Sequence, residues 1–273
     1  MTNFDRVKQY YSVFNEDERL ASSNSGKLEY EMTMKKLMKH LPKNADILDL
    51  GGASGAYTFP LAECGYRMYL ADLSDTLIQK AKDKLQARPN ENVVSCDVVN
   101  ALDLSIYQDG QFDVVLLLGP LYHLQGEAER QRCIQEVGRV LKPGGMVFAS
   151  FIPWLAGSIA IVDRYCWDPN QVDAANLREV FSSGRFNNNS SRGFQEGYYP
   201  TSDEIANLFA QNGFEKISIS SIRGFAYERE DRLYAIQDQE MFEQIVRLAE
   251  ETAKLKEIVE TCGHAMYIGR KGE

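Results

Sequence analysis

The order in which apolar runs and amphipathic segments alternate is the feature that most constrains how this chain of 273 residues folds. Short apolar runs predict strands at 45–50, 67–72, 92–97, 112–118 and 146–152. Helical patterns lie between them, at 55–64, 74–88 and 127–141. Because these connections are too long for hairpins, the strands are expected to pair in parallel through right-handed crossovers. The alternation therefore predicts an α/β fold, a doubly wound and mostly parallel sheet with helices on both faces.

Helices are also predicted before the first strand. Apolar residues recur at helical spacing between Val7 and Phe14, and a second helix is expected over 27–41, where Pro42 stops it. We expect residues 1–41 to form a helical cap over one side of the sheet.

The C-terminal part is predicted to complete the same single domain, 1–273. Residues 153–200 indicate an irregular, aromatic-rich insertion that would act as a lid and bind substrate. After it, a helix is predicted over 202–211, a strand over 214–222, a long helix over 238–260 and a last strand over 265–270.

Charge and cysteine content exclude several classes of protein. The chain has 39 acidic and 30 basic residues, a net charge of −9, which disfavours a nucleic-acid partner because phosphate backbones attract basic surfaces. The five cysteines are scattered, and the N-terminus has no basic region followed by an apolar run, so we expect a cytoplasmic protein with reduced thiols.

One segment, 143–162, has no charged residue and is long enough to span a membrane. It contains Gly144, Gly145 and Pro153, and it begins with a β-rich run. We therefore predict a buried strand that leaves into a loop, and no membrane association.

A glycine-rich loop follows the first predicted strand, in the sequence ILDLGGASG from Ile47 to Gly55. Glycines there allow a ligand to approach backbone N–H groups at a helix start. The dinucleotide pattern requires glycine at positions 51, 53 and 56 and finds one of the three. The pattern of methyltransferases requires positions 51, 53 and 55 and finds two, with Ala53 in the middle.

Acidic residues end the second and third predicted strands. Asp72 follows the first glycine by about twenty residues, where a carboxylate can accept hydrogen bonds from ribose hydroxyls. Asp97 could accept from an exocyclic amino group, while Leu73 and Val98 pack against a purine. Asp72 could instead be an ordinary residue at a helix N-terminus, and Asp97 an ordinary solvated loop acid.

From about Asp46 to Ile152 the chain resembles class I S-adenosylmethionine-dependent methyltransferases. The resemblance rests on, in order, ILDLGGASG, YLADLS, VVSCDV, FDVVLLLGPLYHL and RVLKPGGMVF. The sequence LGPLYHL from Leu118 to Leu124 is similar to the fourth-strand signature of a bacterial small-molecule subgroup, and the last strand is expected to be antiparallel. Ala53, in place of the middle glycine, departs from the family pattern.

The resemblance implies a cofactor, S-adenosyl-L-methionine, with S-adenosyl-L-homocysteine as product, and a small-molecule methyl acceptor. The residues that it implies around the cofactor are Asp49, Gly51, Gly52, Ala53, Gly55, Asp72, Leu73, Cys96, Asp97, Val98, Leu118 and Gly119. Methyl transfer from a sulfonium is an in-line displacement, so the protein mainly positions the acceptor and excludes water.

His123 is the candidate catalytic residue, because an imidazole can take a proton near neutral pH. It could equally shape the pocket without titrating. Candidates for contacts with substrate are Tyr11, Arg19, Tyr122 and Tyr199, and Arg19 could pair with the carboxylate of the cofactor. His40, His123 and His264 are isolated, so no metal site is expected.

Three alternatives remain open at this point. The first is an RNA or DNA methyltransferase of the same fold, although Leu118-Gly119-Pro120-Leu121 stands where base-modifying relatives carry Asp/Asn-Pro-Pro-Tyr. The second is a nicotinamide-dependent oxidoreductase, and the third is a protein that binds S-adenosylmethionine without turnover. The acceptor atom and the oligomeric state do not follow from the sequence.

Overall fold

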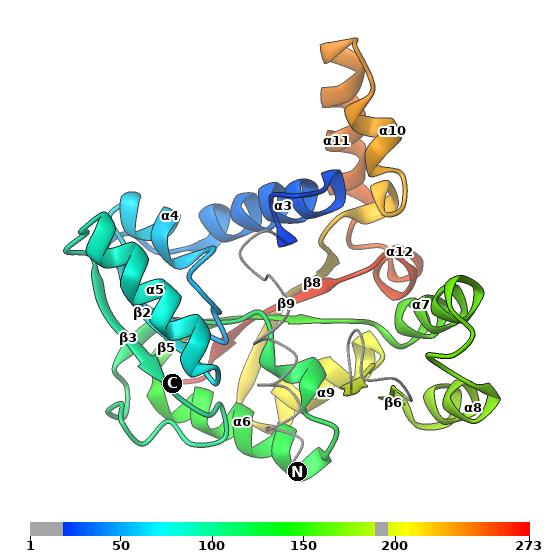
Figure 1. Ribbon diagram of the computed structural model, residues 1–273. Coiled ribbons are helices and arrows are strands. Elements are labelled where there is room, and N and C mark those ends of the chain that lie inside the picture. The colour runs from blue at the N-terminus through cyan, green and yellow to red at the C-terminus, as the bar shows by residue number, and fades with distance from the viewer. Residues whose placement is uncertain (1–18, 189–195) are drawn as a thin grey trace.

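A seven-stranded sheet forms the centre of the computed structural model, which describes residues 19–188 and 196–273 (Figure 1). The strands of this sheet are β1 (Asp46–Leu50), β2 (Arg67–Asp72), β3 (Val93–Val98), β4 (Phe112–Leu117), β5 (Leu141–Phe151), β8 (Phe214–Ser221) and β9 (Ala265–Lys271). Their order across the sheet is β3-β2-β1-β4-β5-β9-β8. Neighbouring strands pair in parallel except at β9, which runs antiparallel to β5 and β8. The predicted fold class is confirmed.

Helices cover both faces of this sheet (Figure 1). One face packs against α6 (Glu127–Val140), α9 (Ser202–Gln211) and α12 (Lys256–Thr261). The other face packs against α3 (Asn24–His40), α4 (Thr58–Glu63), α5 (Asp75–Ala87), α10 (Glu230–Tyr234) and α11 (Gln239–Thr252). Short 3₁₀ turns, η1 (Pro120–His123) and η2 (Gly224–Ala226), follow β4 and β8.

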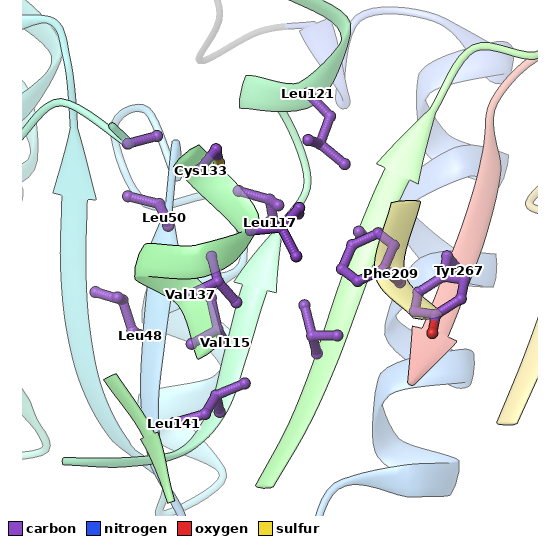
Figure 2. Packing of buried hydrophobic residues seen from close by; sticks show 14 of the residues in the cluster. Leu48, Leu50, Val115, Leu117, Leu121, Cys133, Val137, Leu141, Phe209 and Tyr267 are labelled. Carbon is purple, nitrogen blue, oxygen red and sulfur yellow. The ribbon is translucent and has the colours of Figure 1, made fainter. Parts of the chain in front are cut away.

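The central strands are apolar on both faces because both faces are covered by helices. In Figure 2, Leu48 of β1 and Val115 and Leu117 of β4 lie against Val137 and Cys133 of α6. The intervening residues of the same strands point into the opposite layer. Burial on both faces fixes where these strands end, and therefore where the loops that follow them begin.

Residues 153–200 are more regular than the sequence predicts. They form α7 (Trp154–Trp167), α8 (Ala174–Ser183) and a hairpin of β6 (Arg185–Asn187) and β7 (Glu196–Tyr198). Five residues make a separate small core there: Ile161, Val172, Val180, Phe186 and Tyr199. The prediction of an irregular segment was wrong: helix α8 begins at its cap, Asp173, and ends at the left-handed Gly184.

The uncharged segment 143–162 divides between β5 and α7, so it continues into a helix rather than the expected loop. Among the residues described, no helix has the length and apolar character needed to cross a membrane.

Two other boundaries differ from the prediction. The helix expected over 238–260 is broken into α11 and α12, and the carbonyl of Ala253 at the break accepts a hydrogen bond from the Ser221 amide at 2.9 Å. Strand β5 begins at Leu141, which pairs with Phe112 before the register shifts. The Gly144 turn (φ 72°) therefore lies inside the strand rather than before it.

The loop after β1 has a left-handed backbone at three positions, Gly51 (φ 76°), Ala53 (φ 51°) and Gly55 (φ 91°). The amides of Gly51 and Gly52 both donate to the Ala71 carbonyl of β2, at 2.7 and 3.2 Å. A left-handed conformation is unfavourable for an alanine by roughly 1–2 kcal/mol. Ala53 is thus held in a conformation that suits glycine, which explains the family pattern from which it departs.

We predict that Ala53→Gly stabilises the protein by about 0.5–1 kcal/mol, because relief of the left-handed strain outweighs the added backbone entropy of the unfolded chain, about 0.4–1 kcal/mol. Chemical denaturation of both proteins measures this difference. The matched control is Ala206→Gly in α9, which should destabilise by up to about 1 kcal/mol. Equal destabilisation by both changes would contradict the account of the loop.

Candidate functional site

A cleft opens at the carboxyl ends of β1, β2 and β4, where the strand order reverses between β1 and β4. Ligands of doubly wound sheets bind at this position. The cleft and its open mouth enclose about 1100 Å³, enough for a ligand of several hundred Å³. Its described lining comes mainly from residues 49–54, 72–74, 99–101, 118–120 and 122–124, with Arg19, Leu20 and Tyr57 on the side of the N-terminal helices.

Most of the predicted site residues line this one cleft. They are Asp49, Gly51, Gly52, Ala53, Asp72, Leu73, Leu118 and Gly119 of the cofactor set, together with Arg19, Tyr122 and His123. Tyr11 lies outside the described residues. Gly55, Cys96, Asp97, Val98 and Tyr199 are described but do not line the cleft.

Asp97 is placed too early in the strand to reach the cleft. Its Oδ2 accepts hydrogen bonds from the Ser95 hydroxyl at 2.6 Å and the Tyr107 hydroxyl at 3.4 Å. Val98 is 51% exposed, and Cys96 is buried in the core beneath the sheet. The lining residues on this side are instead 99–101, which sequence reasoning missed although they directly follow the predicted strand.

Tyr199 and Gly55 have packing roles. Tyr199 is buried in the small core of the insertion, stacked on Phe186 with ring centroids 6.2 Å apart. Its ring also fills the space over Gly157, where an added Cβ would lie 2.4 Å from it. Gly55 lies against Phe59 in the same way, and a Cβ added to Gly55 would be 2.6 Å from the Phe59 ring. Neither residue contacts the cleft.

Asp72 joins two of the loops that form the cleft. Its Oδ2 accepts a hydrogen bond from the Ala53 amide at 2.9 Å, and its Oδ1 accepts one from the Ser74 amide at 2.8 Å. Each carboxylate oxygen can accept more than one hydrogen bond. The side chain therefore fixes both loops at the edge of the cleft.

Asp49 lies directly under the glycine loop. An added Cβ on Gly52 would be 2.6 Å from its Oδ2, so only glycine leaves room there. Burial raises the pKa of Asp49 to about 6, and the nearby Asp72 raises it further, while a 2.7 Å hydrogen bond from the Thr58 hydroxyl opposes both. Within the described part of the chain, this second carboxylate has no cationic partner that lowers its pKa.

Aromatic groups also line the cleft. The rings of Tyr122 and His123, in η1, have centroids 4.8 Å apart. Burial lowers the pKa of His123 to about 4, so its imidazole is neutral at physiological pH. Tyr57, missed by sequence reasoning, adds a third ring that stacks on Tyr30 at 5.6 Å.

Arg19 is the one Lys or Arg among the described residues that line the cleft. Its Nη1 lies 2.9 Å from Oε1 of the buried Glu29. Burial alone would raise the pKa of Glu29, but His264, Arg19 and Arg223 more than offset this and hold the pKa well below its usual range. This arrangement makes the charged Arg19–Glu29 pair a fixed part of the cleft's edge.

No cluster of three or more His, Cys, Asp or Glu side chains suited to a metal ion occurs in the described part of the chain.

Comparison with known proteins points to one class of domain. The family model described as a methyltransferase domain matches residues 48–149, which span the glycine loop and the strands that carry the cleft. The chain is 26% identical over 158 residues to the tRNA 5-carboxymethoxyuridine methyltransferase of Escherichia coli (strain K12), covering 55% of this chain and 56% of that protein. The chain thus spans about half the length of this curated relative.

A second relative is the ubiquinone/menaquinone biosynthesis C-methyltransferase UbiE of Yersinia pestis (strain Pestoides F), 25% identical over 184 residues, with 65% of this chain and 69% of that protein covered. The fold is similar to that of a SAM-dependent methyltransferase from Methanosarcina mazei, with a TM-score of 0.60 at 19% identity over 87% of this chain and 97% of that one. Residues 48–149 therefore match a methyltransferase domain model, and the fold is the Rossmann-like one of this structural neighbour.

Proposed function

We propose that this chain is an S-adenosylmethionine-dependent methyltransferase that acts on a small-molecule acceptor in the cytoplasm. The observation that carries the proposal is the cleft at the strand-order reversal, in which Asp49 and Asp72 flank the glycine loop of a methyltransferase domain. The position would suit a dinucleotide as well, but the loop lacks the glycine pattern of the nicotinamide alternative.

The residues of the cleft suit the cofactor in shape and charge. An added Cβ on Gly51 would be 2.6 Å from Pro120, so loop and η1 approach each other closely and leave backbone exposed to the cleft. Asp72 would hold the ribose hydroxyls, and Asp49 would lie near the cationic half of the cofactor. Leu73 and residues 99–101 would contact the adenine, and Arg19 the carboxylate.

When bound, S-adenosylmethionine supplies a methyl group activated by its sulfonium. The chain's own residues position the two reactants, and such ordering can supply about 7–11 kcal/mol of the barrier. The faces of Tyr57 and Tyr122 tolerate a neighbouring positive charge. His123 is neutral, so it adds no repulsion, and its pKa of about 4 makes it a weak base that orients the acceptor rather than deprotonating it.

Charge favours a small acceptor over RNA. The net charge is −9, and the single Lys or Arg in the described lining, Arg19, is already paired with Glu29. A polyanion usually needs several cations near the site. The tRNA methyltransferase relative nevertheless makes RNA the second candidate, and salt-sensitive binding of tRNA in a filter assay would support it. Methyl transfer to a metabolite, followed with radiolabelled cofactor, separates an enzyme from a protein that only binds the cofactor.

Asp72→Ala tests the cofactor site. We expect calorimetry to show a loss of affinity for S-adenosylhomocysteine of about 1–3 kcal/mol, because hydrogen bonds to a charged group are lost and the loop at Ala53 is released. The matched control is Asp97→Ala, an acid at the end of the neighbouring strand but outside the cleft, which should leave affinity unchanged. Unchanged affinity for S-adenosylhomocysteine in Asp72→Ala would show that Asp72 does not contribute to the cofactor site.

The role of His123 is tested by two substitutions. We expect His123→Gln, which keeps a neutral hydrogen-bonding side chain, to retain methyl transfer within a few fold, whereas His123→Ala slows transfer with nearly unchanged cofactor binding. Single-turnover rates measured between about pH 5.5 and 8 should show no inflection from His123, since its pKa is about 4. Equal and severe losses in both variants would indicate a general base.

Asp49 should make the stability of the ligand-free protein depend on pH. Its folded-state pKa of about 6 lies above the unfolded value, so the contribution to stability is complete below about pH 4 and is lost as pH rises through 6. We therefore expect Asp49→Asn to be more stable than wild type near pH 7.5, by up to about 3 kcal/mol, and similar near pH 4. The same variant should bind S-adenosylhomocysteine more weakly.

Thermal unfolding at both pH values and calorimetry with the ligand measure the two effects. A variant that is less stable than wild type at pH 7.5 would show that the buried carboxylate stabilises the fold instead.

A further inference from the structure

A buried charged cluster lies beside the cleft and does not line it. Glu29 of α3 is 7% exposed, and its carboxylate contacts three groups. Its Oε1 lies 2.9 Å from Nη1 of Arg19, and its Oε2 lies 3.1 Å from Nδ1 of His264 and 3.9 Å from Nη2 of Arg223. Arg19 precedes α3, Arg223 follows β8 and His264 precedes β9, so the Glu29 carboxylate joins three separate segments.

Two of these partners belong to, or rest on, walls of the cleft. Arg19 lines the cleft directly. His264 packs on Tyr122, another lining residue, with ring centroids 5.9 Å apart and an interplanar angle of 31°. Glu29 therefore contacts the side chains that determine the position of two walls, although it does not face the ligand space itself.

Stability alone does not account for a charge at this position. A buried ion pair is often no more stabilising than apolar residues of similar volume, because both charges lose their hydration. Arg223 also has a second buried carboxylate, Glu230 of α10, at 2.7 Å. Glu29 is therefore not required to compensate Arg223, and its contacts with Arg19 and His264 are what distinguish it from Glu230.

We propose that Glu29 is a positioning residue that holds the Arg19 guanidinium toward the carboxylate of the bound cofactor. The inference rests on the proposed function. A guanidinium has five N–H donors in a rigid fork, so one held by a fixed carboxylate presents its other donors in a set direction. The free side chain would lose about 2 kcal/mol of rotamer entropy when it binds a ligand, and Glu29 removes much of that loss beforehand.

Orientation and simple charge make opposite predictions. The negative charge of Glu29 repels a ligand carboxylate, so if Glu29 were only a counter-charge, its removal would tighten binding. If Glu29 positions Arg19, its removal weakens binding. The sign of the change therefore distinguishes the two roles.

The test uses the full chain and two ligands, S-adenosylhomocysteine and 5′-methylthioadenosine, which lacks the amino-acid half. In calorimetry we expect Glu29→Gln to weaken S-adenosylhomocysteine binding by about fivefold or more, the difference between a charged and a neutral hydrogen bond to Arg19. Affinity for 5′-methylthioadenosine should not change. The matched control, Glu230→Gln, disturbs the same cluster and should lower the unfolding temperature while leaving both affinities unchanged.

A second variant keeps the test decisive if Glu29→Gln folds poorly. Arg19 is partly exposed, so Arg19→Ala should fold and show the same selective loss. In that background, Glu29→Gln should cause no further loss that is selective for S-adenosylhomocysteine, because its route to the ligand carboxylate through Arg19 is gone.

Unchanged or tighter binding of S-adenosylhomocysteine by Glu29→Gln would overturn the proposal, as would equal losses for both ligands or an additive selective loss in the double variant. A wild-type protein that binds neither ligand would instead refute the proposed function.

Discussion

The reversal of strand order between β1 and β4 is the constraint on which the rest of this structure depends. The crossovers that leave these two strands turn to opposite sides of the sheet, and the cleft opens at the strand ends where they diverge. Burial of both faces of β1 and β4 fixes where the strands end. The loops at Gly51 and Gly119, which line the cleft, therefore extend from rigid strands. Asp72 of β2 holds the first of these loops through its hydrogen bond from the Ala53 amide.

Two buried carboxylates near this cleft have opposite electrostatic surroundings, and their pKa values shift in opposite directions. Asp49 has no cationic partner among the described residues that lowers its pKa, and its pKa is raised to about 6, mainly by burial. Glu29 contacts two arginines and shares a hydrogen bond with His264, and these contacts lower its pKa despite burial. An uncompensated carboxylate is the arrangement expected where a cationic ligand supplies the missing charge, and a compensated one is expected where a side chain holds its neighbours in place. In the proposed function, Asp49 is therefore the carboxylate whose charge the ligand compensates, and Glu29 the one that positions its neighbours.

Local patterns predicted much of the fold and part of the site. The bounds of β2 and α9 agree with prediction, because apolar runs and caps such as Ser74 are local signals. Asp72 and the glycine loop were found because the ends of parallel strands share one edge of the sheet. The sequence prediction placed Asp97 in the cleft, which the structure shows it does not line. The residue at which a strand leaves its sheet depends on pairing with neighbouring strands, and the sequence alone does not show that pairing. Glu29 was not predicted at all, since its contact with His264 joins residues 235 positions apart.

The central claim is that the cleft beside Gly51 binds S-adenosylmethionine through the two acids that flank it. The most direct measurement is a crystal structure of the protein with S-adenosylhomocysteine. The account predicts density for the ribose against Asp72, with the amino-acid half running past Gly51 toward Arg19. A ligand bound elsewhere on the molecule, or a cleft that remains empty at saturating ligand, would contradict it.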